Sequence, residues 1–189
     1  MRSFTSLLRC IAVAAVLSLA SEASLTPAQQ KISMIERGRW PASGSMAFTP
    51  RELLALGMSQ INAAAPGAVL NPTLHLGQNG ATATALVDFD LLKNANRSGQ
   101  SNGLLSRLIS GQQPVSVSVG ISSAHGKMTV HPTAVSVSGY SVTGPALNFL
   151  VQNFLVSPYP ETVIDRPFAL PRGVSRVEVN TKSALVYRR

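Results

Sequence analysis

The stretch "PVSVSVGIS", residues 114–122, decides the fold class of this chain. Apolar and small polar residues alternate in it without a break, with Val115, Val117, Val119 and Ile121 in one set and Ser116, Ser118 and Gly120 in the other. Successive side chains of a β-strand point to opposite faces of the sheet. The pattern therefore predicts an antiparallel strand with one face toward a core and one toward solvent.

Neighbouring stretches carry the same signal. "ATATALVDFDLL" (81–92) places Ala83, Ala85, Val87, Phe89 and Leu91 on one face and predicts a second half-buried strand. "AVLNPTLHL" (68–76) predicts an edge strand, because Pro72 has no N–H to donate to a partner strand. "KMTVHPTAVSVSGYSVTG" (127–144) predicts a long or kinked strand, with its break at His131–Pro132. These stretches indicate a sheet whose neighbours in sequence are also neighbours in space.

The C-terminal part begins with a connector rich in proline, "RPFALPRG" (166–173). Two short alternating runs follow, "VSRVEVN" (174–180) and "ALVYRR" (184–189), and they predict a closing hairpin.

Two stretches have the sequence of a capping box and predict the starts of two helices: Thr26-Pro27-Ala28-Gln29 and Thr49-Pro50-Arg51-Glu52. Gly38 is placed to end the first helix. Shorter helices are predicted at "LLSRLIS" (104–110) and at 145–156. The fold class expected is α+β, a mostly antiparallel curved sheet with three to four short helices covering its concave or apolar face.

The first 23 residues read as a signal peptide. Arg2 and Arg9 precede the apolar run "CIAVAAVLSLA" (10–20), and small residues allow cleavage before Ser24. The alternative is an uncleaved membrane anchor. We expect a periplasmic or secreted protein, with a helix and linker at 24–45 and one α+β domain at 46–189. Cys10 is the only cysteine, so the mature chain would contain no disulfide.

The net charge of the chain is +8, and without residues 1–23 it keeps 14 basic against 7 acidic residues. An exported basic protein favours acidic surfaces, of which anionic lipid headgroups are the expected partner. Nucleic acid is not expected, because the basic residues form no run and are not interleaved with aromatic residues.

No catalytic or metal-binding signature is present. His75, His125 and His131 lack a second ligand at metal-binding spacing, and no nucleophile elbow, phosphate-binding loop or dinucleotide motif occurs. Asp88 and Asp90 would share one face of the strand at 81–92, where a polar outer face explains them more simply than acid–base chemistry does. The sequence predicts neither a cofactor nor an enzyme.

The predicted helix at 145–156 carries more large apolar residues than one buried stripe can use. Leu147, Leu150, Val151 and Phe154 form an ordinary core stripe, and Phe149 and Leu155 lie outside it. Flanking loops, a lipid or a second subunit could cover these two side chains. Leu105, Leu108, Phe149, Leu150, Phe154 and Leu155 are the candidate lipid-binding residues.

The order of these elements resembles that of the LmeA-like phospholipid-binding proteins, which are similar to the wider tubular lipid-binding group. The resemblance lies in "FTPRELLALGMSQIN" (48–62), "ATALVDFDLL" (83–92), "VSVSGYSVTGPALNFLVQNFL" (135–155) and "PFALPRGVSRVEVNTKSALVYR" (167–188). It implies an elongated sheet wrapped around a helix, with an apolar groove for acyl chains. Residues 24–45 and 93–111 have no counterpart in that family.

The sequence therefore predicts an exported lipid-binding module that holds acyl chains between sheet and helix without catalysis. The alternative is a structural or protein-interaction component of the bacterial cell envelope. In that case a homo-oligomer or another envelope protein would be the partner.

Overall fold

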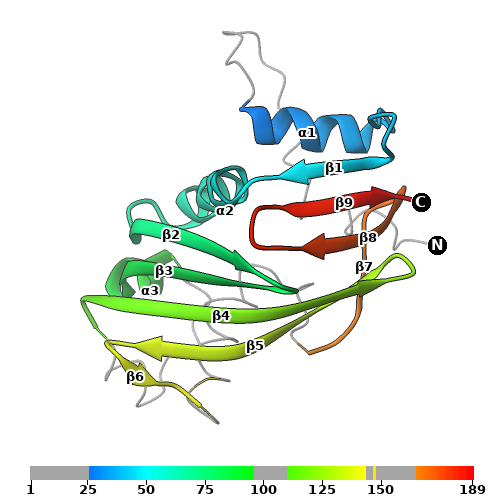
Figure 1. Ribbon diagram of the computed structural model, residues 1–189. Coiled ribbons are helices and arrows are strands. Elements are labelled where there is room, and N and C mark those ends of the chain that lie inside the picture. The colour runs from blue at the N-terminus through cyan, green and yellow to red at the C-terminus, as the bar shows by residue number, and fades with distance from the viewer. Residues whose placement is uncertain (1–25, 96–109, 144–146, 148–164) are drawn as a thin grey trace, which may run out of the picture.

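The computed structural model describes residues 26–95, 110–143, 147 and 165–189. This part of the chain is an α+β structure in which strands form two antiparallel sheets (Figure 1). The larger, called the main sheet below, has six strands, and the smaller has three. The predicted mostly antiparallel α+β class is confirmed.

Both predicted helix starts are confirmed. Helix α1 (Pro27–Glu36) begins at a capping box in which Thr26 and Gln29 each accept the backbone N–H of the other. Helix α2 (Pro50–Ala64) begins with the same arrangement between Thr49 and Glu52. Each box satisfies two backbone donors that a helix start leaves without a partner. Gly38, with φ of 68°, ends α1 as expected.

The main sheet follows the chain in order. Its strands are β2 (Val69–Gly77), β3 (Gly80–Asp88), β4 (Gln112–Ala124), β5 (Lys127–Val137) and β6 (Tyr140–Ser141), and β7 (Phe168–Ala169) pairs with the start of β5. Strand β2 is an edge strand, as Pro72 predicted, and its pairing with β3 is interrupted between Leu70 and Thr73. The pairing of β5 with β4 shifts register beside Pro132, at the position where the sequence predicted a break.

Two strand predictions were wrong in their extent. The strand predicted at 81–92 stops at Asp88, because helix α3 (Phe89–Ala95) begins there. The strand predicted at 127–144 stops at Val137, because Ser138 and Gly139 adopt φ of 53° and 82° and reverse the chain into β6. In both places the apolar and polar residues continue to alternate after the backbone has changed direction.

The small sheet brings together both ends of the described chain, in the order β1 (Ser45–Phe48), β9 (Ala184–Arg188), β8 (Val174–Val179). The predicted closing hairpin is β8 and β9. Strand β8 also lies beside the distal part of β4, beyond the point where β3 begins opposite Gly120. Hydrogen bonds join the two sheets there, from Asn79 N–H to Val179 O (2.9 Å) and from Val177 N–H to Ser123 Oγ (2.9 Å).

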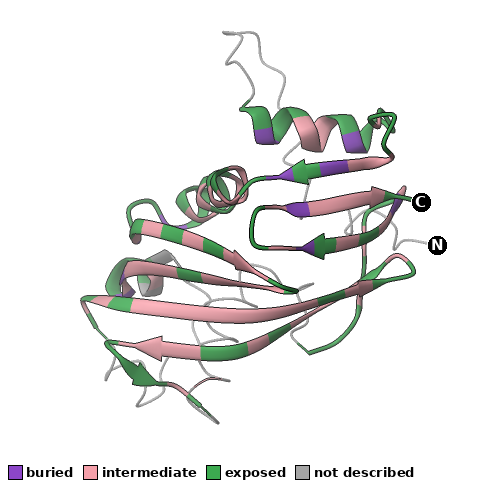
Figure 2. Cartoon of the chain, in the orientation of Figure 1, coloured by how far each residue is buried: buried purple, intermediate pink, exposed green. Residues whose placement is uncertain are grey.

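The buried core lies between the small sheet and the helices (Figure 2). Ile35, Met46, Phe48 and Val174 form its centre. Partly buried residues from α1, α2 and the small sheet pack around it, among them Ile32, Trp40, Leu53, Leu56 and Val186. Trp40, in the connection between α1 and β1, therefore packs against the core. The division of the chain at residues 45 and 46 stays a prediction.

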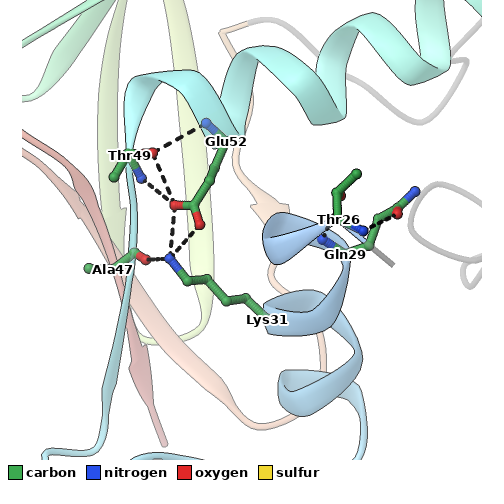
Figure 3. Close-up of polar contacts among 6 residues, drawn as sticks. All are labelled: Thr26, Gln29, Lys31, Ala47, Thr49 and Glu52. Atoms are coloured by element: carbon green, nitrogen blue, oxygen red, sulfur yellow. Dashed lines mark hydrogen bonds and ion pairs between the residues drawn. The ribbon is translucent and has the colours of Figure 1, made fainter. Parts of the chain in front are cut away.

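Lys31 links three elements beside this core (Figure 3). Its Nζ lies 2.7 Å from Glu52 Oε1 and donates to Ala47 O at 2.7 Å. The ammonium also lies 5.5 Å from the centre of the Phe48 ring. The hydrogen bond from Lys31, followed by the one from the Thr49 backbone, lowers the pKa of Glu52. This arrangement fixes α1 against β1 and α2.

Candidate functional site

The candidate lipid-binding residues predicted from the sequence, namely Leu105, Leu108, Phe149, Leu150, Phe154 and Leu155, lie outside the described residues. Leu147, from the predicted core stripe, is described and partly buried. The signal peptide prediction at 1–23 also falls outside them. The main sheet, whose strands β2 to β5 are described in full, therefore provides the candidate site.

Strand register divides the main sheet into two chemically different faces. On one face Leu74, Ala83, Val117 and Val135 lie in one row across four strands. The rows on either side are also apolar, with Leu76, Ala81 and Val119 in one and Ala85, Val115 and Val137 in the other. We call these ten residues the apolar face. Along β3 its side chains are alanines, flanked by longer leucines on β2 and valines on β4.

The apolar face is covered far less than a core surface would be. Every one of its side chains is partly buried except Ala83, which is exposed. Among the buried apolar residues of the described chain, only Val87 belongs to β2, β3, β4 or β5. Figure 2 shows most of the buried residues on α1 and the small sheet, and the remainder between α2 and β2 and where β3 meets α3. A sheet normally packs one face onto a core, whereas this apolar face is only partly buried.

The opposite face is lined by hydroxyl groups. Thr73, Thr84, Ser116, Ser136 and Ser141 form one row across all five strands from β2 to β6. Neighbouring hydroxyls bond to each other, with Thr73 Oγ1 2.6 Å from Thr84 Oγ1 and Thr82 Oγ1 2.9 Å from Ser118 Oγ. This face was predicted as the solvent side of the sheet, and such cross-strand pairs stabilise it.

A shallow depression of about 290 Å³ is lined by residues of both sheet faces, among them Thr84 and Ser116 of the hydroxyl face and Val115 of the apolar face. Its lining comes from β2 to β5 and the turn after β5: Asn71, Thr84, Ala85, Leu86, Pro114, Val115, Ser116, Ser136 and Gly139. None of these nine side chains is a titratable group. The depression therefore supplies neither a general base nor a charged group to activate one of its hydroxyls.

The ionisable groups elsewhere form small exposed clusters. His131 Nδ1 lies 2.6 Å from Asp165 Oδ1, and both side chains are at least half exposed. Arg176, Glu178 and Tyr187 form a second cluster on the small sheet. Glu178 accepts from Arg176 Nε and from Tyr187 Oη, both at 2.8 Å, and the Arg176 guanidinium lies 3.8 Å from the Tyr187 ring centre. Sequence reasoning missed both, because His131 and Asp165 meet only in the fold, and Tyr187 joins Arg176 and Glu178 only through strand pairing.

Hydrogen bonding explains the electrostatics of the second cluster. The bond from Arg176, and then the one from Tyr187, lower the pKa of the Glu178 carboxyl. The same two bonds raise the pKa of Arg176 and of Tyr187. These hydrogen bonds stabilise the charge state that each group ordinarily has at neutral pH. None of the pKa shifts therefore produces a general acid or base that titrates near pH 7.

Asp88 and Asp90 do not lie side by side on a strand face as the sequence predicted. Asp88 Oδ1 accepts the N–H groups of Asp90 and Leu91, each at 3.1 Å, at the start of α3. Asp90 Oδ2 accepts the N–H of Gly111 at 2.9 Å. Both carboxylates therefore accept hydrogen bonds from backbone N–H groups. Within the described ranges no three His, Cys, Asp or Glu residues are grouped so that they could hold a metal ion.

Comparisons with protein-family models, with curated proteins and with solved structures found nothing that matches this chain. The resemblance to LmeA-like proteins therefore stays a prediction. In the part of the chain that the structure describes, no helix is long and apolar enough to cross a membrane.

Proposed function

We propose that the protein is an exported, non-catalytic lipid-binding module, and that an acyl chain lies on the apolar face of the main sheet. The observation that carries the proposal is the contrast between this face and the core. Ten apolar side chains form three rows across β2 to β5 and are at most partly buried, whereas the hydrophobic core cluster of the described chain lies between α1, α2 and the small sheet.

The shape of the face favours a narrow hydrocarbon ligand. Ala81, Ala83 and Ala85 form a low track along β3 between the longer side chains of β2 and β4. A chain lying along this track would contact methyl groups on both sides and meet no charged group. Each buried CH₂ contributes about 0.8 kcal/mol, so about ten methylenes supply roughly 8 kcal/mol before the cost of immobilising the ligand. Binding therefore needs no catalytic residue and no cofactor.

The finer features of the proposal come from the sequence. A curved sheet with three to four helices over its apolar face would close the site. Leu105, Leu108, Phe149, Leu150, Phe154 and Leu155 would contact the acyl chain from the second wall. The expected location is the periplasm or the extracellular space, with a lipid or membrane surface as the partner.

Titration with a fluorescent fatty acid tests the proposal. Ala83 is exposed on β3 at the centre of the alanine track, so Ala83→Asp should weaken binding at least tenfold without harming the fold, because a carboxylate in contact with hydrocarbon loses hydration. Ala134→Asp is the matched control, since Ala134 is also exposed but lies opposite Ser118 on the hydroxyl face. Absence of fatty-acid binding by the unmodified protein, or equal loss in both variants, would contradict the proposal.

The envelope-component alternative predicts a different result. If a second subunit covers the apolar face, Ala83→Asp should convert an oligomer into a monomer in light-scattering measurements. A monomer that binds the fatty acid excludes this alternative.

A further inference from the structure

Four segments that are distant in sequence meet at one end of the molecule, where the C-terminal label stands in Figure 1. They are the end of α1 with the loop to β1 (36–45), the β4–β5 turn (124–128), the start of β8 (171–175) and the end of β9 (187–189). Together they carry six basic residues, which we call the cationic end: Arg37, Arg39, Lys127, Arg172, Arg188 and Arg189.

The backbone holds these segments together. Three hydrogen bonds join them: Arg188 N–H to Gly44 O at 2.8 Å, Arg189 N–H to Gly173 O at 2.9 Å, and Gly126 N–H to Ser175 O at 2.6 Å. A Cβ at Gly126 would lie 2.8 Å from Arg189 Nη2, so this guanidinium lies directly against the β4–β5 turn. Two buried residues anchor these segments to the core: Ile35, next to the first segment, and Val174, within the third. The six charges are therefore presented on a fixed scaffold.

The cationic end is not neutralised within the described chain. All six side chains belong to exposed residues. The ion pairs of the described residues join Lys31 to Glu52, His131 to Asp165 and Arg176 to Glu178, and none includes a residue of the cationic end. Glu36 is the one acidic residue in the four segments. Clustered like charges repel each other, so this end favours an anionic partner.

We propose that the cationic end is a docking surface for a bilayer that contains anionic lipids. Five of its six residues are arginines, whose planar guanidinium groups bind phosphate oxygens with paired hydrogen bonds. The charges are spread over four segments at one end of the molecule, which suits a two-dimensional array of headgroups. Docking requires only these charges, whereas its use for lipid uptake rests on the proposed function.

Nucleic acid fits this end less well. Single-strand binding surfaces add exposed aromatic side chains on which bases stack. The aromatic residues of the four segments are Trp40 and Tyr187; Trp40 is partly buried against the core, and the Tyr187 ring is already covered by Arg176. A bilayer needs no such stacking surface.

Trp40 makes the proposal directly measurable, because it is the only tryptophan of the chain and lies in one of the four segments. Its fluorescence is followed while the mature protein is titrated with vesicles of phosphatidylcholine alone or of phosphatidylcholine mixed with phosphatidylglycerol, and cosedimentation gives the partition coefficient. We expect binding to the mixed vesicles only, and its loss in high salt.

Each basic residue near an anionic surface contributes about fivefold to partitioning, so Arg188→Gln with Arg189→Gln should lower the coefficient about 25-fold. The double variant Arg37→Gln with Arg39→Gln should lower the partition coefficient by a similar factor. It replaces the first double variant if that one fails to fold. The control is Arg51→Gln with Lys182→Gln, two exposed residues outside the four segments. It should bind as the unmodified protein does.

The proposal is overturned by equal binding to both kinds of vesicle, by full binding of the Arg188/Arg189 variant, or by an equal loss in the control. Tighter binding of single-stranded DNA than of mixed vesicles at the same salt concentration would also overturn it. Fatty-acid titration of the same proteins separates the two proposals. Vesicle docking without fatty-acid binding supports the docking surface and contradicts the proposed acyl-chain site.

Discussion

Lys31 Nζ lies 2.7 Å from Glu52 Oε1 and 2.8 Å from Glu52 Oε2, so one ammonium bridges the carboxylate that also closes the capping box of α2. The two residues lie on different helices, 21 positions apart in sequence. Because Lys31 also donates to Ala47 O, the contact joins α1, β1 and α2 beside the buried core. The N-terminal helix is thus tied to the small sheet by polar as well as apolar contacts.

Glu52→Gln isolates the ionic part of this contact, because glutamine can still close a capping box. The Glu52 and Lys31 side chains are partly exposed, so the loss should be about 1 kcal/mol of the free energy of unfolding at pH 7. Since the pKa of Glu52 is lowered in the folded state, its contribution is complete above the unfolded value of about 4.3 and is lost as the pH falls through the folded pKa. Urea unfolding of the unmodified protein and of Glu52→Gln, at pH 7 and near pH 2, measures the loss of stability and its dependence on pH. A difference that persists at low pH would contradict the ionic assignment.

Asp88 is predicted to act on the stability of α3. Its carboxylate accepts two backbone N–H groups at the start of that helix, so Asp88→Ala should lower the free energy of unfolding by about 1 kcal/mol. Asp88→Asn should retain most of the stability of the unmodified protein, because asparagine is an equally good cap. Thermal or urea denaturation measures both variants. Equal losses in the two would show that the charge, and not the capping oxygen, is what α3 requires.

Ala83→Leu is predicted to block the alanine track without introducing charge. The added side chain would fill the space between Leu74 on β2 and Val117 on β4, its neighbours in the same row. Fatty-acid affinity should fall about tenfold, while the melting temperature should stay within a few degrees, because the residue is exposed. Ala134→Leu on the hydroxyl face is the control. Tighter binding by Ala83→Leu would mean that the ligand lies on a flat surface, with no track.

Local chemistry made part of this fold predictable. The capping boxes at Thr26 and Thr49 need only residues three positions apart, and both helices start where they indicate. The alternation at 114–122 likewise predicted β4 and its two faces. These features depend on residues that are close together in sequence, so local sequence patterns are enough to predict them.

Other features depend on contacts that local patterns do not contain. Phe89 and Leu91 continue the alternation of β3, although helix α3 has begun there and Asp88 accepts hydrogen bonds from its first N–H groups. The small sheet pairs Ser45 with Tyr187 across nearly the whole chain. The cationic end was unforeseen for the same reason, because its six basic residues are scattered in sequence and meet only when β1, β8 and β9 assemble.

Native mass spectrometry of the protein extracted from membranes tests the central claim most directly. The acyl-chain proposal predicts a species heavier than the mature chain by the mass of one lipid, and predicts that Ala83→Asp loses this species while Ala134→Asp keeps it. The mass of the bare chain alone in the unmodified protein, together with no uptake of a fluorescent fatty acid, would contradict it.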